Sequence, residues 1–385
     1  MNFMPTEEQR MAVDGFRRFL EAKIRPIADA HKDIYIEKEK MREILEMMLP
    51  YGMGGNGPIA EEFGGEGMDW LTFGMLYEQL ARVSADIAIT LLIQQMVAYT
   101  FEKCTNEKMR AEYLPRVLRA EIIGCSGISE PDVGSNVAEV KCRARAEGSD
   151  LIINGEKTWI SNGHYSDFCC LIVRTSDDGA KGISMVLVDR KLHGYESRNI
   201  EKLGLNSTST AQLFFGNVRV PATNLMIQPG AGLKNTVVLF EKARPLVAMT
   251  SVGIAQAALE VAVAYAKERK QHGKVIAGHQ LIQGMLAEMA TELDAARLLV
   301  YRAFDMIQKG QRSETQSAMA KWYATEIAVS VASRAVQIHG GNGITREFGV
   351  ERLFRAARMM TIPDGTTEIQ KLIIGRGLTG VNAFA

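Results

Sequence analysis

The chain has 385 residues, of which 46% are apolar and 23% are charged, as in an ordinary soluble globular protein. Its 45 Lys and Arg residues balance 45 Asp and Glu residues, which argues against a nucleic-acid-binding protein because such proteins carry a basic excess. The length predicts two or three domains.

Cysteine spacing and the N-terminus bear on the compartment. The five cysteines show no Cys-x-x-Cys or other metal-ligand spacing, so we expect reduced thiols, no metal site and a cytoplasmic protein. Residues 1–18 alternate charged with apolar side chains and lack a long apolar run. The sequence therefore predicts neither a signal peptide nor a membrane span.

Residues 1–121 are predicted to form an N-terminal helical domain. Thr6 and Gln9 have the spacing of a capping box, and apolar residues follow at helical intervals until Pro26, which is expected to break the pattern. A glycine-rich loop then precedes a helix over 70–83. The almost wholly apolar stretch 84–99 predicts a buried helix, which could also form the wall of a pocket.

Residues 122–230 are predicted to form a middle β domain. Short β-rich runs at 151–153, 169–173, 183–188 and 212–215 are punctuated by turn signals, among them Asn154-Gly155 and the run 177–179. This pattern is typical of a small antiparallel sandwich or barrel.

Residues 231–385 are predicted to form a C-terminal helical bundle. Apolar residues step by three and four from Met285 to Ile307, Gly310 ends that helix, and Ser313 with Gln316 is expected to cap the next one. The chain is thus an α+β protein in the order helices, sheet, bundle. It contains no Walker sequence and no βαβ dinucleotide unit.

One carboxylate stands out near the C-terminus. Asp364 lies between Pro363 and Gly365, and Thr366 or Thr367 could cap the helix that follows. A carboxylate on such a stiff turn projects from a rigid support, as a general base must. On spacing alone an ordinary Asp-Gly turn is the simpler interpretation.

Several motifs together resemble the acyl-CoA dehydrogenase family. Residues 127–131 with Gly134-Ser135 resemble its first signature, and residues 157–163 resemble the strand that covers its flavin. Arg244-Pro245, the run 268–274, His279-Gln280 and the run 337–343 match further landmarks in order, so that the resemblance covers nearly the whole chain.

The resemblance implies that the protein binds FAD. Ser129 and Ser161 would hydrogen-bond the isoalloxazine ring, where donors favour the reduced flavin, and Trp159 would cover one ring face. Ser135 would contact the flavin phosphate or the CoA side, and Thr366 a flavin phosphate.

The resemblance also implies a homotetramer built as a dimer of dimers. In that assembly Arg269, Gln337 and Gly341 would hold the pyrophosphate and adenosine of an FAD bound mainly by a neighbouring subunit. Arg244 and Gly365, together with Ser135, would contact the substrate.

The implied reaction is α,β-dehydrogenation of an acyl-CoA thioester. Asp364 stands at the family's catalytic glutamate position. The alternative position of the base in some relatives is occupied by Ala243, which cannot serve, so the resemblance favours Asp364 as the base. Asp86 is the reserve candidate, although a carboxylate in the first turn of a helix is its simpler interpretation.

The base position departs from the family pattern. Aspartate is one methylene shorter than glutamate, and Pro363 replaces an aromatic residue. Both changes remove bulk, so we expect a branched or cyclic acyl group such as cyclohexanecarbonyl-CoA. Because the stretch 84–99 contains no Lys or Arg, the acyl group is expected to be uncharged. The first signature and the position of Ala356 also depart from the pattern.

Other functions stay open from sequence. An electron-transfer flavoprotein or a similar carrier is the expected electron acceptor. A nitroalkane oxidase, an acyl-CoA oxidase or an enoyl-CoA reductase running the reverse reaction would resemble the same family. A non-catalytic flavoprotein or helical scaffold is the alternative of another class.

Overall fold

The N-terminal part of the chain is helical, as predicted, in a computed structural model that describes residues 4–383. Its helices are α1 (Glu7–Phe19), α2 (Arg25–Ala30), α3 (Lys38–Met48), α4 (Trp70–Val83), α5 (Ala85–Glu102) and α6 (Glu107–Leu118). The expected capping box is present, because the Thr6 side chain accepts from the Gln9 N–H and the Gln9 side chain accepts from the Thr6 N–H. Ser84 caps α5 by accepting from the N–H of Ile87.

The prediction that Pro26 breaks the first helical run is wrong. A π-helical segment, Leu20–Ile24, joins α1 directly to α2. Pro26 lies in the first turn of α2. Proline is tolerated there because the helical pairing has just changed: the Arg25 N–H donates to the Leu20 carbonyl, five residues back, and Pro26 has no N–H to pair.

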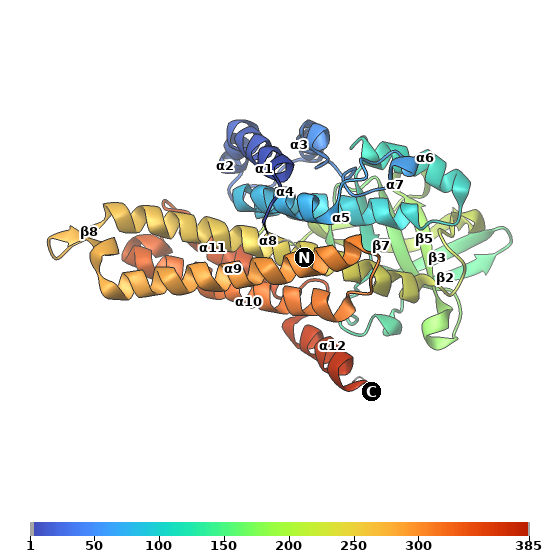
Figure 1. Ribbon diagram of the computed structural model, residues 1–385. Coiled ribbons are helices and arrows are strands. Elements are labelled where there is room, and N and C mark those ends of the chain that lie inside the picture. Colours follow the sequence, from blue (N-terminus) through green and yellow to red (C-terminus); the bar gives the residue numbers. More distant parts are fainter. Residues whose placement is uncertain (1–3, 384–385) are drawn as a thin grey trace.

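The middle of the chain forms a seven-stranded sheet, drawn mainly in green at the right of Figure 1. Its strands are β1 (Gly124–Gly127), β2 (Arg143–Glu147), β3 (Asp150–Ser161), β4 (Phe168–Arg174), β5 (Ile183–Asp189), β6 (Glu196–Asn199) and β7 (Thr210–Pro221). Most neighbouring strands pair antiparallel, as predicted. In addition, β4 pairs in parallel with β1 and at one position with β2.

Both faces of β4 are covered. Cys170 and Ile172 belong to a large core shared with the helices, whereas Cys169 and Leu171 belong to a second core formed among residues of the middle β region. Successive residues of a strand point to opposite faces, which explains why this strand is a continuous apolar run in the sequence. The five cysteines are free and buried.

The predicted turn at Asn154-Gly155 is wrong, because both residues lie inside β3. The pairing of β3 with β7 shifts register between Ile153 and Gly155, and Gly155 has a positive φ of 140°. An Asn-Gly pair supplies the same left-handed backbone to a bulge as to a turn.

The C-terminal part is a helical bundle. It contains α8 (Gly232–Glu268), α9 (Gln280–Gln308), α10 (Glu314–His339), α11 (Val350–Met360) and α12 (Thr367–Thr379). α10 packs against the other four helices. In Figure 1, α8, α9 and α10 lie side by side and extend from the sheet to the small hairpin of β8 (Lys270–Gln271) and β9 (Lys274–Val275) at the far end.

α8 is long and apolar enough to cross a membrane by length and composition, but 67% of its most apolar 18-residue window is buried inside the protein. It packs against α4, α5, α9, α10 and α11, and it therefore behaves as the central core helix of the fold.

Two helix starts differ in detail from the expectation. Ser313 occupies the N-cap position of α10 and Thr366 that of α12, but neither side chain makes a capping hydrogen bond. Ser313 Oγ instead accepts a hydrogen bond from Ser317. The domain limits at 121/122 and 230/231 stay a prediction; the elements change type near both.

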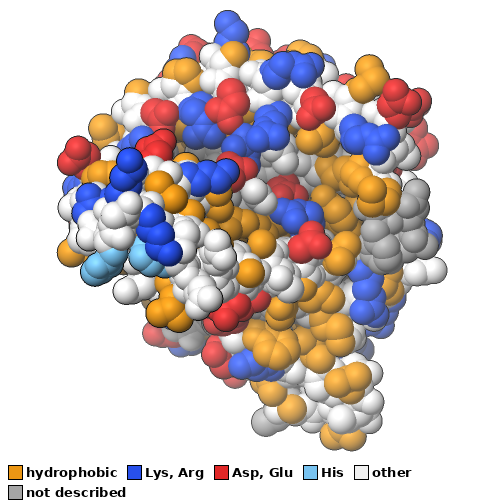
Figure 2. Space-filling model, turned by 60° about the vertical axis from the view of Figure 1, so that its left-hand side comes forward, with side chains coloured by type: hydrophobic (Ala, Val, Ile, Leu, Met, Phe, Trp, Pro, Cys, Tyr) orange, Lys and Arg blue, Asp and Glu red, His pale blue; other side chains and the backbone are white. Residues whose placement is uncertain are grey.

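On the face drawn in Figure 2, Lys and Arg side chains are interspersed with Asp and Glu, and apolar side chains gather in the lower half of the view. On this face, basic and acidic side chains are therefore mixed instead of being separated into two areas.

Candidate functional site

The loop between α11 and α12 presents Asp364 on a strained backbone. Asp364 has a φ of 54° and Gly365 a φ of 94°, both in the left-handed region. Aspartate enters this region more readily than most residues, but a non-glycine residue there still costs free energy and persists only where its surroundings impose it. Such residues cluster at functional sites.

Three side chains from other elements hold this loop by its carbonyl groups. Arg244 Nε of α8 donates to the Asp364 carbonyl at 3.3 Å. Gln370 Nε2 of α12 donates to the carbonyls of Asp364 (3.1 Å) and Gly365 (2.7 Å). Lys321 Nζ of α10 donates to the carbonyls of Thr361 (2.8 Å) and Gly365 (2.9 Å). The loop is therefore fixed from three helices.

The Asp364 carboxylate itself is left free. Its Oδ2 atom is buried and has no hydrogen-bond partner within residues 4–383. Burial raises the pKa of Asp364, while Arg244 and Lys321 act in the opposite direction without cancelling that effect. The backbone N–H of Asp364 also donates to no group of the described chain. A proton acceptor and a hydrogen-bond donor are thus both available at one residue.

Lys321 is a site residue that sequence reasoning missed. It is fully buried, and burial lowers its pKa to about 8, against the attraction of Asp364. A lysine without exposure is rare unless its ammonium group is paired. The available signal was a lysine within the mainly apolar run of α10, but its partners lie about forty residues further along the chain.

The sheet brings together Ser129, Trp159 and Ser161. The N–H of Thr158 donates to the carbonyl of Ser129 at 2.9 Å, which places Ser129 beside Trp159. Trp159 has a φ of 62° and a side chain that is 63% exposed, at a register shift between Lys157 and Ile160. An indole so exposed is available to cover a planar ligand.

A buried ion pair fixes the loop that carries Ser129. Lys157 Nζ of β3 donates to Glu130 Oε1 at 2.8 Å and to the carbonyl of Ile128 at 2.9 Å. Glu130 also accepts from the N–H groups of Lys141 and Cys142. Both charged groups are at most 5% exposed. The motif residues Glu130 and Lys157 thus have a structural role that the sequence did not reveal.

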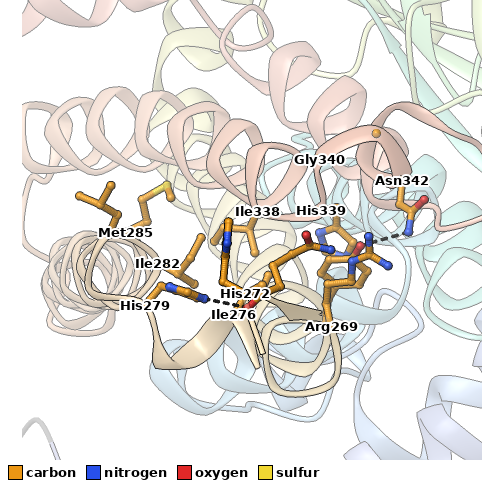
Figure 3. A pocket seen from close by; sticks show the side chains of 14 residues that line it. Arg269, His272, Ile276, His279, Ile282, Met285, Ile338, His339, Gly340 and Asn342 are labelled. Atoms are coloured by element: carbon orange, nitrogen blue, oxygen red, sulfur yellow. Dashed lines mark hydrogen bonds between the residues drawn. The ribbon is translucent and has the colours of Figure 1, made fainter. Parts of the chain in front are cut away.

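A cavity of about 630 Å³ lies where the β8–β9 hairpin meets the end of α10. Figure 3 shows Arg269, His272 and His339 around this space, with Asn342 held by the Tyr265 hydroxyl at 3.1 Å. The rings of Tyr265 and His339 stack, with centroids 4.2 Å apart.

Gly340 and Gly341 leave the far side of this cavity open, since no atom lies within 4 Å of where their Cβ atoms would stand. The structure thus brings Arg269 and Gly341 together at one cavity. Gln337 is exposed on α10 but does not line this cavity.

The remaining predicted residues are placed separately. Thr366 lines a second hollow of about 370 Å³ with Arg358 and Glu368. Ser135 is exposed on the loop between β1 and β2. Within the described residues, no hydrogen bond joins the sheet residues Ser129, Trp159 and Ser161 to the loop of Asp364.

Asp86, the reserve candidate for the base, is buried and fully engaged. Its Oδ1 accepts from the Ser207 N–H at 2.8 Å, and its Oδ2 pairs with Arg352 at 2.8 Å. A carboxylate with both oxygens occupied is poorly suited to accept a proton, so Asp86 ties α5 to the β domain and to α11.

These features fit an FAD molecule. An elongated dinucleotide needs a surface for a planar ring, cationic and backbone donors for phosphate, and space for an adenosine. The exposed Trp159, the arginine of the 630 Å³ cavity and the two unobstructed glycines supply groups of each kind.

Comparisons with known proteins agree with this arrangement. Family models for the N-terminal, middle and C-terminal domains of acyl-CoA dehydrogenase match residues 6–121, 125–218 and 230–379. A glutaryl-CoA dehydrogenase of Desulfococcus multivorans is 35% identical over 99% of both chains, and an acyl-CoA dehydrogenase of Bacillus subtilis is 34% identical over 97% of this chain and 99% of the other. The solved structure of a glutaryl-CoA dehydrogenase from Mycobacterium smegmatis in complex with FADH2 is 28% identical, with a TM-score of 0.90 over 99% of this chain and 97% of the other.

Proposed function

The chain belongs to the acyl-CoA dehydrogenase family of FAD-dependent oxidoreductases, and from this premise we propose that it dehydrogenates an uncharged, cyclic or branched acyl-CoA between its α- and β-carbons with Asp364 as the base. The observation that carries the proposal is the buried, unpartnered Oδ2 of Asp364 on a loop held from three helices.

In this reaction Asp364 Oδ2 takes the α-proton of the thioester. The backbone N–H of Asp364 donates to the thioester oxygen and stabilises the negative charge that develops there. FAD, when bound, would supply the acceptor for the β-hydrogen: the α-carbon loses a proton to Asp364, the β-carbon loses a hydride that carries both electrons, and a carbon–carbon double bond forms. Arg244, Gln370 and Lys321 keep the base in place.

We assign the ring of FAD to the sheet. Ser129 and Ser161 hydrogen-bond the isoalloxazine, and Trp159 covers one of its faces. Ser135 and Thr366 contact a flavin phosphate, with Ser135 also available to the CoA side. Gly365, beside the base, gives the substrate close access to the backbone.

The adenosine end is assigned to a neighbouring subunit, and hence the protein to a homotetramer. The support is that Arg269 and Gly341 line a cavity at the end of the bundle, whereas the ring-binding residues lie on the sheet. The exposed Gln337 is available to the same partner.

Arg269→Ala is expected to weaken FAD retention about 10- to 100-fold, the effect of one lost charged hydrogen bond. Lys270→Ala is the matched control, because Lys270 is exposed next to Arg269 but does not line the cavity. Flavin release on dilution measures FAD retention, and sedimentation measures the oligomeric state. A fully active monomer would contradict the assembly.

The acyl group is proposed from the size and charge of the residues at the site. Asp364 is one methylene shorter than glutamate and Pro363 is smaller than an aromatic residue, so a ring such as that of cyclohexanecarbonyl-CoA is proposed beside the α-carbon. α5, the proposed wall, contains no Lys or Arg from 84 to 99. Lys242 of α8 lies over the ring of Tyr99 at 3.8 Å, and burial lowers the pKa of Lys242 to about 8, while Glu102 at the end of α5 acts in the opposite direction.

Anaerobic mixing of the FAD-loaded protein with acyl-CoAs tests this function. Cyclohexanecarbonyl-CoA is expected to bleach the flavin, butyryl-CoA to do so more slowly, and glutaryl-CoA to fail because its terminal carboxylate would be buried unpaired at a cost of several kcal/mol. Fast bleaching by glutaryl-CoA would overturn the uncharged assignment. Rapid oxygen uptake on aeration would indicate an oxidase, and bleaching by no acyl-CoA would indicate a scaffold.

Asp364→Glu is expected to change the preference for the acyl group. The added methylene moves the carboxylate by about 1 Å, a displacement that can change rates on the order of 10²-fold. Straight-chain butyryl-CoA should gain relative to cyclohexanecarbonyl-CoA in the rate of flavin reduction. An unchanged ratio of the two rates would show that the length of the base does not select the acyl group.

An electron-transfer flavoprotein is proposed as the acceptor of the electrons, and the cytoplasm as the compartment, in keeping with five free cysteines.

A further inference from the structure

The cavity beside the β8–β9 hairpin gathers histidines around an unpaired arginine (Figure 3). The sequence has six histidines, and three of them, His272, His279 and His339, line this cavity. Arg269, which also lines it, makes no ion pair and no side-chain hydrogen bond within residues 4–383. The proposed function assigns Arg269 to the diphosphate and adenosine end of FAD but gives the histidines no role.

The charge inside this cavity is entirely basic. Among the lining residues that the structure describes, there is no aspartate or glutamate, and α9 contributes only apolar side chains. Three further charged residues of the hairpin region, Glu268, Lys270 and Lys274, are exposed and do not line the cavity. Lys274 is held outside it, because its Nζ donates to the Gly278 carbonyl at 2.8 Å. An anion that entered the cavity would therefore meet donors and no carboxylate.

His272 lies at the tip of the hairpin. It has a φ of 51° and Gly273 a φ of 81°, so both central residues of this two-residue turn are left-handed, as in a type I′ turn. Asparagine is the residue that such a position favours, and histidine enters it less readily. The ring of His272 is exposed, and neither of its nitrogens has a hydrogen-bond partner in the described part of the chain. The turn alone therefore does not account for an imidazole here.

His279 lies across the hairpin from His272, with ring centroids 6.2 Å apart. Its Nε2 lies 3.3 Å from the Gln271 carbonyl, which can only accept, so Nε2 carries a hydrogen and Nδ1 is the nitrogen that gains or loses a proton. His339 is a fixed part of the wall: it is 5% exposed, stacks on Tyr265 and donates through Nδ1 to the Ala335 carbonyl at 2.7 Å. His272 and His279 are thus the two rings that can turn a nitrogen to a ligand.

We propose that His272 and His279, in their protonated form, bind the diphosphate of FAD together with Arg269, so that the protein holds FAD more tightly at pH 6 than at pH 8. This inference rests on the proposed function, because it assumes that the diphosphate enters this cavity. Histidine ordinarily changes its charge between pH 5 and 8, and a hydrogen bond between an imidazolium and a phosphate is about twice as strong as a neutral one.

The direction of the pH effect follows from linkage. The two phosphates of FAD are diesters and stay ionised over this range, so the bound diphosphate favours the protonated rings and binding takes up protons. FAD retention must therefore strengthen as the pH falls through the histidine range and weaken as the pH rises through it.

The test measures the FAD dissociation constant at pH 6 and pH 8, at one ionic strength, from the fluorescence of flavin released when the loaded protein is diluted. The wild type should bind FAD about 10-fold or more tightly at pH 6. His272→Asn keeps a residue suited to the turn but cannot be protonated, so combined with His279→Gln it should bind equally at both pH values, as weakly as the wild type at pH 8. His272→Arg, with a permanent charge, should keep tight binding at pH 8.

His193→Gln is the matched control. His193 ends the short helix α7 (Arg190–His193) in the middle β region, where its Nδ1 accepts from the Asp189 N–H at 3.1 Å, and it does not line the cavity. This variant should keep the wild-type ratio of the two dissociation constants.

Three results would overturn the inference. The first is equal retention of FAD by the wild type at both pH values, and the second is an unchanged ratio in the double variant. The third is a pH effect on the half-saturating concentration of acyl-CoA but not on FAD retention, which would assign the histidines to the diphosphate of CoA. Arg269→Ala separates this inference from the proposed function: full FAD retention in that variant would remove FAD from the cavity altogether, whereas weakened retention beside an unchanged ratio in the double variant would remove only the role of the histidines.

Discussion

Asp364→Asn is expected to reduce its flavin about 10³-fold more slowly than the wild type while still folding and binding FAD. Asparagine keeps the size of the side chain and the backbone N–H but cannot accept the α-proton, and a positioned base contributes about 10²–10⁴-fold. Stopped-flow measurement of flavin bleaching by saturating acyl-CoA isolates this step from later electron transfer. Asp86→Asn is the control: Asp86 has no direct role in the chemistry, so this variant should keep the wild-type rate per folded molecule.

Asp364→Asn should be at least as stable as the wild type at pH 7. Burial raises the pKa of Asp364 above its unfolded value, so the native state binds this proton more tightly than the unfolded state does. That contribution to stability is present below about pH 4 and is lost as the pH rises through the folded pKa. Asparagine has no charge to bury, so Asp364→Asn should be more stable than the wild type only above about pH 4, where the carboxyl group of the unfolded wild type ionises. A variant that unfolds more easily at pH 7 would contradict this account.

Lys157→Met is expected to destabilise the fold by about 3–5 kcal/mol. The Lys157–Glu130 pair is almost fully buried, and removing one partner leaves the other charge uncompensated in the interior. Since this pair also holds the Ile128–Glu130 loop, FAD binding should weaken with it. Denaturant unfolding of the FAD-free and FAD-loaded forms measures both effects.

Arg143→Met is the matched control for Lys157→Met. Arg143 lies on the adjacent strand β2 and pairs with Asp177, but both side chains are at least half exposed. Exposed pairs contribute about 0–1 kcal/mol, so this variant should be nearly as stable as the wild type. Equal losses in the two variants would show that burial of the Lys157–Glu130 pair has no special effect.

Local sequence patterns predicted most of the fold. The helices over 70–83 and 85–102, the apolar strands and the order of helices, sheet and bundle all depend on periodicity within short segments. The errors occurred where one residue type has two uses. Pro26 opens α2 instead of ending a helix, and Asn154-Gly155 forms a bulge instead of a turn.

The candidate site was predictable only in part. Asp364 was found from its Pro-Asp-Gly context and the family resemblance, and its strained φ and free Oδ2 are consistent with that choice. Lys321 and Gln370 could not be linked to Asp364 from sequence. They hold the loop by its backbone carbonyls, and every residue type has such a carbonyl.

The central claim is that Asp364 removes the α-proton of a cyclic acyl-CoA as the flavin is reduced. The most direct measurement is a single-turnover reduction of the wild-type flavin by cyclohexanecarbonyl-CoA with deuterium or hydrogen at the α-carbon, repeated with Asp364→Asn. We expect the wild type to be bleached, more slowly with α-deuterium, and the variant to stay oxidised over the same time. Bleaching of Asp364→Asn at the wild-type rate, with the same isotope effect, would place the base elsewhere and contradict the claim.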